Sequence, residues 1–292
     1  MHSPDAPTPA TKAPLRAGSL RLAVRDLPLV QAFYESVLGL ETLESGPDHA
    51  RLGAGGAALL ELVGNRRFTP AGPRAAGLFH AAFLLPDRAS LGAWLTHAAS
   101  TKAPIVGASD HIVSEAVYLS DPEGNGVEVY ADRPPARWRG PDGAIRMSTG
   151  PLDIADLAAA ATAPWAGFPS GGTLGHVHLQ VGALGEADRF WRDGLGLDLT
   201  TRYPGASFYA TGGYHHHIAA NIWNSSGAPR RLDNMTGLQA VQLVAADAQT
   251  LDATLACAAR AGIRAERRAG MAVVRDPWNI EIELTTEQTD AG

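Results

Sequence analysis

The chain has 292 residues, of which 45% are hydrophobic and 18% are charged, proportions ordinary for a soluble globular protein of one or two domains. Its formal net charge of −6 at pH 7 argues against nucleic acid and anionic membranes as partners. The single cysteine, Cys257, excludes an intramolecular disulfide and a cysteine metal cage, and no apolar run approaches the roughly 20 residues that span a bilayer. We therefore expect a soluble, cytoplasmic protein with no membrane partner.

The first 17 residues are rich in proline, alanine and threonine and have no continuous apolar stretch of the signal-peptide type. This composition predicts a disordered N-terminal lead over residues 1–17, because such a segment buries little apolar surface.

After this lead, an ungapped repeat relates two stretches, SLRLAVRDLPLVQAFYESVLGLETLE and HVHLQVGALGEADRFWRDGLGLDLTT. The alignment places Leu22 on Leu179 and Phe33 on Phe190. Each copy predicts a short strand, a helix whose aromatic pair faces a core, and a glycine-punctuated exit into another strand. The chain therefore contains an internal duplication.

A second kind of repeated unit follows each of these stretches. Leu78–Leu85 predicts a strand, Arg88 to about Ser100 predicts an amphipathic helix, and the segments SEAVYLS and VEVY predict strands joined by the turn DPEGNG. The end of the chain repeats this order in LQAVQLVA, AQTLDATLACAARAG and MAVVRDPWNIEIEL. We count four βαβββ units, over residues 18–64, 77–132, 174–224 and 237–286.

These units predict two domains of two units each. Between them lies a segment rich in Pro, Gly and Ala, with a short helical patch near Ile154–Ala161, which we interpret as a linker. The predicted organisation is a lead (1–17), an N-terminal domain (18–132), a linker (133–173), a C-terminal domain (174–286) and a tail (287–292).

A glutamate in the second unit stands out by its place in a strand. Glu128 alternates with Val127 and Val129, so it faces away from them, and an inward carboxylate is costly unless a cation or hydrogen-bond donors meet it. Taken alone, such a glutamate also fits a surface ion pair. His80, on the first strand of the same unit, is a candidate partner, although single strand histidines are usually hydrogen-bonded structural groups.

The third unit supplies the remaining imidazoles. His176 and His178 lie two residues apart on its first strand, so both side chains face the same way. Three further histidines, His215–His217, enter the strand HIAANIW. Two neutral imidazoles and one carboxylate on one side of a metal is the arrangement that non-haem Fe(II) oxygenases use.

The first and fourth units lack these histidines. Ser19 and Arg21 occupy the positions of His176 and His178, and Ala240 occupies that of His80. Two glutamates, Glu281 and Glu283, remain on the last strand without histidine partners. Only units two and three can therefore assemble a site with two histidines.

The motifs LGHVHLQV, GGYHHHIAANIW, GLFHAAFLLPDR and HIVSEAVYLSDPEGNGVEVYADRP together resemble the catechol 2,3-dioxygenase-like branch of the vicinal oxygen chelate superfamily. The resemblance extends from Gly18 to about Thr286. It implies an α+β protein in which four βαβββ modules pair into curved mixed sheets, the glyoxalase/bleomycin resistance/extradiol dioxygenase fold, around a divalent metal.

The resemblance also implies which residues hold that metal. Carried over position by position, the ligands are His80, His176 and Glu128, and the cofactor is Fe(II), with Mn(II) as the alternative. Extradiol enzymes of the two-domain type keep these ligands in the C-terminal half, where this chain has Ala240. The site then bridges the halves, either within one chain or across a homodimer.

Four further residues match positions near the substrate in this family. Tyr118 lies ten residues before the glutamate, and His111 precedes it. His216 or His217 corresponds to the catalytic base. The implied activity is extradiol ring cleavage of a small aromatic diol by dioxygen.

Two other functions stay open on the sequence alone. A glyoxalase- or isomerase-like enzyme would need a second glutamate ligand, where the third unit offers Asn221 or a histidine. A non-catalytic protein that binds small aromatic compounds, or confers resistance to them, would use the same cavity. The aromatic residues that are candidates for lining it are Phe208, Tyr209, Tyr214 and Trp223.

Overall fold

A computed structural model describes residues 8–287, so the predictions for residues 1–7 and 288–292 lie outside the described part. In chain order the elements are β1 (Leu15–Val24), α1 (Leu27–Phe33), the π-helical turn η1 (Tyr34–Leu38), β2 (Glu41–Ser45), β3 (His49–Ala54), β4 (Ala57–Gly64), β5 (Gly77–Leu85), α2 (Arg88–Ser100), β6 (Ile105–Asp110), β7 (Ser114–Ser120), β8 (Gly126–Asp132), the 3₁₀ turn η2 (Pro135–Arg137), α3 (Ile154–Ala159), β9 (Thr173–Gln180), α4 (Leu184–Asp188), the π-helical turn η3 (Arg189–Gly194), β10 (Asp198–Tyr203), β11 (Ala206–Ala210), β12 (Ile218–Asn221), β13 (Gly237–Ala245), α5 (Ala248–Arg260), β14 (Glu266–Arg268), β15 (Met271–Arg275) and β16 (Glu281–Thr286).

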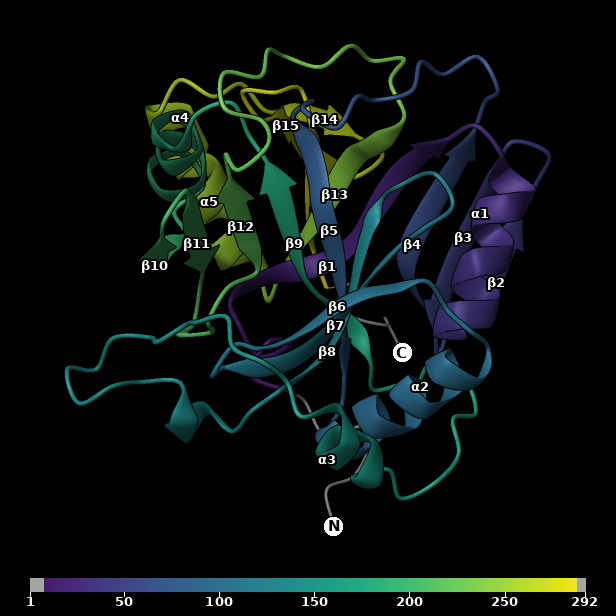
Figure 1. Cartoon of the computed structure of the whole chain (residues 1–292). Helices are drawn as coiled ribbons and strands as arrows, with labels where there is room; N and C mark the ends of the chain where they lie inside the picture. Colours follow the sequence, from purple (N-terminus) through teal and green to yellow (C-terminus); the bar gives the residue numbers. More distant parts are fainter. Residues whose placement is uncertain (1–7, 288–292) are drawn as a thin grey trace, which may run out of the picture.

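The strands form two eight-stranded mixed sheets, each built from two units (Figure 1). In the first, which we call the inner sheet, the order is β10-β11-β12-β9-β5-β8-β7-β6, and β5 of unit two lies antiparallel to β9 of unit three. In the second, the outer sheet, the order is β14-β15-β16-β13-β1-β4-β3-β2, with β1 antiparallel to β13. The predicted α+β fold of paired βαβββ modules is confirmed, and units two and three pair within one chain.

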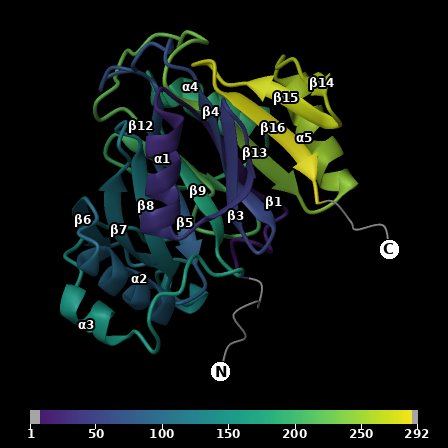
Figure 2. The same cartoon turned by 90° about the vertical axis from the view of Figure 1, so that its right-hand side faces the viewer.

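The four units place their helices on the outside of these sheets (Figures 1 and 2). Along β5, Ala81, Phe83 and Leu85 belong to the main core, whereas Ala82 and Leu84 pack in a separate cluster on the opposite, concave face. His80 shares the concave face because side chains alternate along a strand. Among the helices of residues 8–287, none combines the length and the hydropathy that a bilayer crossing requires.

The repeated Asp-Pro turns fold for the same local reason in both sheets. Asp121 Oδ1 accepts two backbone N–H bonds inside its turn, each of 2.9 Å, and Asp276 Oδ1 does the same at 2.9 and 2.8 Å. Gly124 and Asn279 hold equivalent left-handed positions, with φ of 85° and 77°. Glycine and asparagine tolerate this conformation best. Each turn starts the last strand of its unit, and the first of them leads to Glu128.

The ordered chain begins earlier than the sequence suggests. β1 starts at Leu15, which pairs with Ala245 and is buried, and Ala10 is also buried. The expectation of disorder is therefore wrong for residues 8–17. Leu15 and Ala17 already follow the strand alternation, which the surrounding prolines and alanines conceal in the composition.

The segment expected to be a linker contains α3, close to the predicted helical patch, and η2. α3 packs beside α2, where Leu157 is completely buried and its carbonyl lies close to Gly92 (Figure 2). Arg133 forms an ion pair with Asp110, with two N–O distances of 2.6 and 2.7 Å. These contacts fix the segment against unit two on its way to unit three.

Candidate metal centre and cavity

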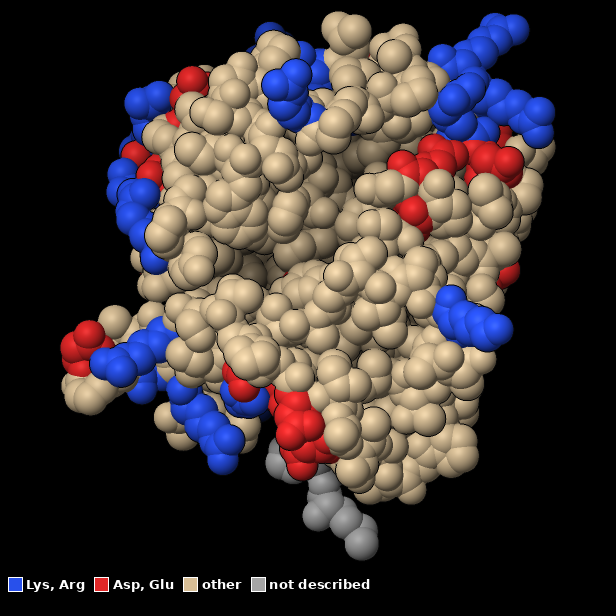
Figure 3. All heavy atoms as spheres, in the orientation of Figure 1, with Lys and Arg blue, Asp and Glu red and all other residues tan. Residues whose placement is uncertain are grey.

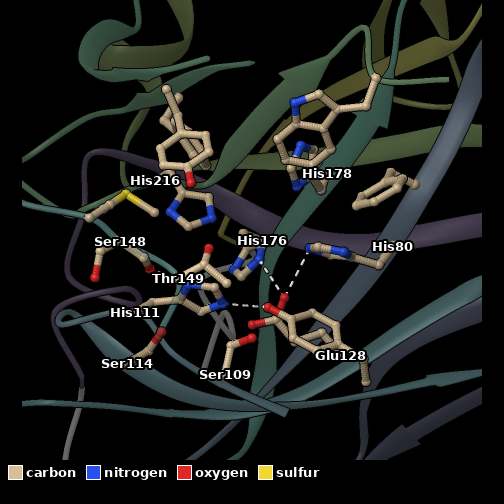
Figure 4. Close-up of a pocket in the computed structure, with 16 residues that line it drawn as sticks. His80, Ser109, His111, Ser114, Glu128, Ser148, Thr149, His176, His178 and His216 are labelled. Atoms are coloured by element: carbon tan, nitrogen blue, oxygen red, sulfur yellow. Dashed lines mark hydrogen bonds and ion pairs between the residues drawn. The ribbon is translucent and has the colours of Figure 1, made fainter. Parts of the chain in front are cut away.

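Three metal-ligand candidates converge on the concave face of the inner sheet. His80 comes from β5, Glu128 from β8 and His176 from β9, three strands that are neighbours in the sheet (Figure 4). Glu128 Oε2 lies 2.9 Å from His80 Nε2 and 3.4 Å from His176 Nε2, and the three ligand atoms lie within 4.8 Å of one another. These residues come from both halves of the chain, and the fold brings them together.

The protonation of this group suits a metal ion. Burial alone would raise the pKa of Glu128, but the facing imidazoles of His176 and His80 outweigh it and hold that pKa well below its usual value. Burial lowers the pKa of His176 to about 4. At neutral pH the carboxylate is therefore ionised and the His176 ring is neutral, which are the states in which these groups bind metals.

The spacing of the donor atoms also fits a metal. Ligands about 2.1 Å from a divalent ion and at right angles to each other lie about 3 Å apart. The separations of Glu128 Oε2 from the two imidazole nitrogens, 2.9 and 3.4 Å, lie on either side of this value. His80 Nε2 is buried and has no well-aligned hydrogen-bond partner, although Glu128 is close. A cation between the three groups would satisfy all of them, and this donor set suits iron, manganese or zinc.

A cavity of about 280 Å³ opens in front of these ligands. On the face drawn in Figure 3, charged side chains lie towards the periphery and the hollowed middle is formed by other residues. Glu128 is the only carboxylate in the lining that the described residues provide. Besides the three ligand candidates, the lining consists of Phe79, Ser109, His111, Ser114, Tyr118, Met147, Ser148, Thr149, His178, Tyr203, Phe208, His216 and Trp223.

Tyr118 and His111 line the cavity and form a hydrogen-bonded pair, of which Figure 4 labels His111. His111 Nδ1 lies 2.7 Å from the carbonyl of Ser148, which only accepts, so Nδ1 carries the hydrogen. In the neutral ring Nε2 is then an acceptor, and Tyr118 Oη donates to it over 2.5 Å. Burial and the nearby Glu128 raise the pKa of Tyr118 well above its usual value, so this residue keeps its proton at neutral pH.

The backbone beside His111 is strained. Ile112 has a φ of 69°, a left-handed conformation that is an outlier for a β-branched residue. Asp110 Oδ1 accepts the Ile112 N–H over 2.9 Å and holds this turn. Strain of this kind persists where the surroundings enforce it, often at functional sites. Here it sits in the hairpin that directs His111 towards Tyr118.

Of the two histidines expected as base, only one reaches the cavity. His216 lines it, and its ring centroid lies 4.1 Å from that of His176. His217 is buried and does not line the cavity; its Nε2 donates to the Ala10 carbonyl over 3.1 Å and its ring packs on Tyr214. Burial lowers the pKa of His216 well below its usual value and that of His217 to about 3.

The aromatic residues suggested for the cavity also divide. Phe208 and Trp223 line it, but Tyr209 and Tyr214 do not. Tyr209 Oη donates to Asp188 Oδ1 over 2.7 Å in the core, and Tyr214 packs behind the cavity, with its Oη 3.3 Å from Asp132 Oδ1.

The cavity lining extends beyond the ligand and catalytic residues that the family resemblance implies. His178 lines the cavity, as its alternation with His176 allows, and its Nε2 lies 3.0 Å from Asn221 Nδ2. Phe79 stacks edge-on against His178, with ring centroids 5.0 Å apart. The linker contributes Met147–Thr149. This last contribution has no signal in the sequence, because the segment is irregular and reaches the cavity through tertiary packing.

Comparison with known proteins agrees with the family resemblance of the sequence motifs. The family described as the Glyoxalase/Bleomycin resistance protein/Dioxygenase superfamily matches residues 16–129 and 173–284. A curated protein named catechol-2,3-dioxygenase, from Bacillus subtilis (strain 168), is 38% identical over 266 residues, covering 89% of this chain and 93% of that protein.

Solved structures share the fold at low sequence identity. The crystal structure of a "putative dioxygenase" from Bacillus subtilis subsp. subtilis str. 168 matches with a TM-score of 0.60 and 14% identity, over 93% of this chain and 86% of that one. Glyoxalase I from Zea mays matches with a TM-score of 0.56 and 16% identity, over 92% of each chain. The chain belongs to the Glyoxalase/Bleomycin resistance protein/Dioxygenase superfamily.

Proposed function

We propose that this protein is an extradiol dioxygenase, which uses dioxygen to cleave the ring of a catechol-type substrate beside its two hydroxyl groups. The observation that carries the proposal is the meeting of His80, Glu128 and His176 at one wall of a cavity that also holds His216 and the Tyr118–His111 pair. The similarity to a relative named catechol-2,3-dioxygenase supports the same function.

His80, His176 and Glu128 would hold Fe(II), with Mn(II) as the alternative. When bound, the ion would supply Lewis-acid activation of the substrate oxygens and a template for dioxygen. One carboxylate and two neutral imidazoles leave a divalent ion with a net positive charge, which favours an anionic, deprotonated catechol in the cavity.

The surrounding side chains handle protons and orientation. His216, on the cavity wall beside His176, would accept a proton from a catechol hydroxyl as general base. Tyr118, which remains protonated, would hydrogen-bond a substrate oxygen by turning its O–H from His111 towards the substrate, and later in the reaction His216 would give back the proton it accepted. Phe79, Phe208 and Trp223 would pack against the aromatic ring.

The stoichiometry of the reaction is simple. One catechol and one dioxygen combine, a ring carbon–carbon bond breaks, and both oxygen atoms enter a ring-opened semialdehyde. The cavity of about 280 Å³ suits a small aromatic diol. The single cysteine is consistent with a cytoplasmic enzyme, which we include in the proposal.

Oxygen uptake tests the proposal. Protein purified without oxygen and loaded with Fe(II) is expected to consume one dioxygen per catechol and to form a yellow ring-cleavage product. Resorcinol, whose hydroxyl groups are not adjacent, is the matched control and is expected to give no uptake. If the reduced, iron-loaded protein consumes no oxygen with catechol, the proposed function is wrong. Binding of catechol without oxygen uptake would then favour a role in binding small aromatic compounds without chemistry.

A further inference from the structure

Three side chains form a hydrogen-bonded chain that ends at the cavity. Asp132, the last residue of β8, lies with Oδ1 2.8 Å from His215 Nε2. His215 Nδ1 lies 2.8 Å from His216 Nδ1. Neither Asp132 nor His215 lines the cavity, and His215 is completely buried, whereas His216 is part of the wall.

The donors and acceptors of Asp132, His215 and His216 decide where the hydrogens in this hydrogen-bonded chain lie. The Asp132 carboxylate only accepts, so His215 Nε2 carries a hydrogen and donates to it. When the His215 ring is neutral, its Nδ1 has a lone pair, which accepts from His216 Nδ1–H. A neutral His216 ring with hydrogen on Nδ1 has its lone pair on Nε2. These positions follow from the donors and acceptors that the contacts allow.

Aromatic side chains pack against His215, the middle residue of the hydrogen-bonded chain. The His215 ring packs against Tyr214 and Trp138, with centroid distances of 4.0 and 5.0 Å. Tyr214 Oη also lies 3.3 Å from Asp132 Oδ1 and 2.9 Å from Tyr130 Oη. Trp138 belongs to the segment that connects the two halves of the chain, so that segment supports the base as well as lining the cavity. These contacts oppose rotation of the His215 ring.

We propose that Asp132 and His215 are positioning residues, which hold His216 in the tautomer with hydrogen on Nδ1 and a free Nε2 lone pair. In the opposite tautomer Nε2 would carry a hydrogen, and the ring could not accept a proton through that atom. Both residues act through His216 and do not touch the substrate. The catalytic meaning of this arrangement rests on the proposed function, but the tautomer itself does not.

The tautomer is directly measurable by nuclear magnetic resonance on the full chain, labelled with ¹⁵N-histidine and treated with a chelator. Protonated and unprotonated ring nitrogens give well-separated ¹⁵N signals. In the wild type, His216 is expected to show a protonated Nδ1 and an unprotonated Nε2. His215→Phe keeps a buried ring but removes both bonds, so the His216 signals are expected to shift towards an average of the two tautomers.

Two further variants serve as a control and as a rescue for this measurement. His217→Phe is the matched control, because His217 is the adjacent buried histidine but lies outside the hydrogen-bonded chain; it is expected to leave the His216 signals unchanged. His215→Asn places an amide oxygen near the position of Nδ1, and is expected to restore the Nδ1–H tautomer. A wild-type His216 protonated at Nε2 overturns the proposal without any variant, as does a His215→Phe protein with unchanged His216 signals.

Kinetics on the iron-loaded proteins give the second readout. His215→Phe is expected to lower kcat by roughly 10- to 100-fold, by analogy with the loss found when partners that orient metal-binding histidines are removed. Its iron content and its KM for catechol are expected to stay within about twofold of the wild type, and His215→Asn is expected to recover part of kcat. An unchanged kcat overturns the positioning role. If the wild type consumes no oxygen at all, the proposed function fails while the tautomer measurement still stands.

Discussion

The inner and outer sheets place different partners beside a buried glutamate on their last strands. Both place a glutamate at the same position of the last strand: Glu128 beside Ala82 in the inner sheet, and Glu283 beside Gln242 in the outer sheet. In the inner sheet Glu128 faces two imidazoles. In the outer sheet Glu283 faces Arg21, whose Nη2 lies 2.8 Å from its Oε1.

Arg21 acts as a built-in cation for the outer sheet. Its guanidinium also pairs with Glu61 over 2.7 Å and approaches Glu281 at 3.6 Å. Such planar, permanently charged groups match carboxylates well. Where the chain supplies the positive charge itself, no metal is needed; where it supplies neutral imidazoles, the buried carboxylate is left for a bound cation. The inner sheet therefore carries a candidate metal centre, and the outer sheet carries an ion-pair network.

The same register bears on the glyoxalase-like alternative. β4 carries Glu61 beside Arg21, whereas β12 carries Ala219 beside His178. The position at which a glutamate lies in the outer sheet is therefore an alanine in the inner one. Asn221, two residues further, has its side-chain amide 3.0 Å from His178 Nε2. The inner site thus lacks, on this strand, the second glutamate that a glyoxalase- or isomerase-like centre would need.

The largest expected effect separates the two glutamates. Glu128→Gln is expected to weaken binding of a divalent ion by at least about 100-fold, since even residues that only support a ligand cost up to that much. Glu283→Gln, the matched change in the outer sheet, is expected to leave metal affinity unchanged. Titration of Mn(II) into both variants measures this. Equal losses of affinity would mean that the two sheets do not differ as described.

Removing the built-in cation should affect stability and not metal binding. Arg21→Met leaves Glu283 without its partner in a site where both side chains are largely buried, so the free energy of unfolding is expected to fall by about 3 kcal/mol. The double variant Arg21→Met, Glu283→Gln is expected to recover part of this loss. Urea denaturation of the single and double variants measures it. A stable single variant would show that Arg21 does not serve as the cation.

A smaller effect concerns pH. His217 corresponds to Leu59 in the outer sheet, and burial lowers its pKa to about 3. Between this value and about 6.5 the unfolded chain binds a proton that the folded chain does not, so stability falls as pH falls through this window. His217→Leu is expected to remove this contribution, about 2 kcal/mol at pH 5. Thermal or urea unfolding from pH 7 to pH 5 measures the slope, which would be unchanged in the variant if His217 were protonated in the fold.

The smallest effect concerns the hairpins. The inner hairpin carries His111 and the strained Ile112, whereas the outer one turns at Ala269 and Gly270. Ile112→Gly is expected to relieve this strain and so to raise the free energy of unfolding. The gain is expected to be at most about 1 kcal/mol, because glycine also loses more conformational entropy on folding than isoleucine does. Oxygen uptake with catechol is expected to fall, since His111 becomes less firmly placed. Loss of stability in this variant would show that the conformation is not strained.

Much of the site is predictable because strand alternation fixes which side chains share a face. Strand alternation and the repeated units point to His80, His176, His178 and Glu128 as metal-ligand candidates, and the family resemblance reduces these to His80, His176 and Glu128. The choice between His216 and His217 is not predictable in this way, because both precede the regular strand, where no alternation rule applies. Nor are the roles of Met147 and Trp138, which come from an irregular segment and depend on packing across the chain.

Metal stoichiometry tests the central claim most directly. The 292-residue chain, stripped with a chelator and titrated with Fe(II) without oxygen, is expected to bind one ion per chain, and His176→Ala is expected to bind none. The variant Ser19→Ala, changed at the matching position of the outer sheet, is expected to keep one ion. Retention of stoichiometric iron by His176→Ala would contradict the assignment of the inner sheet as the metal centre.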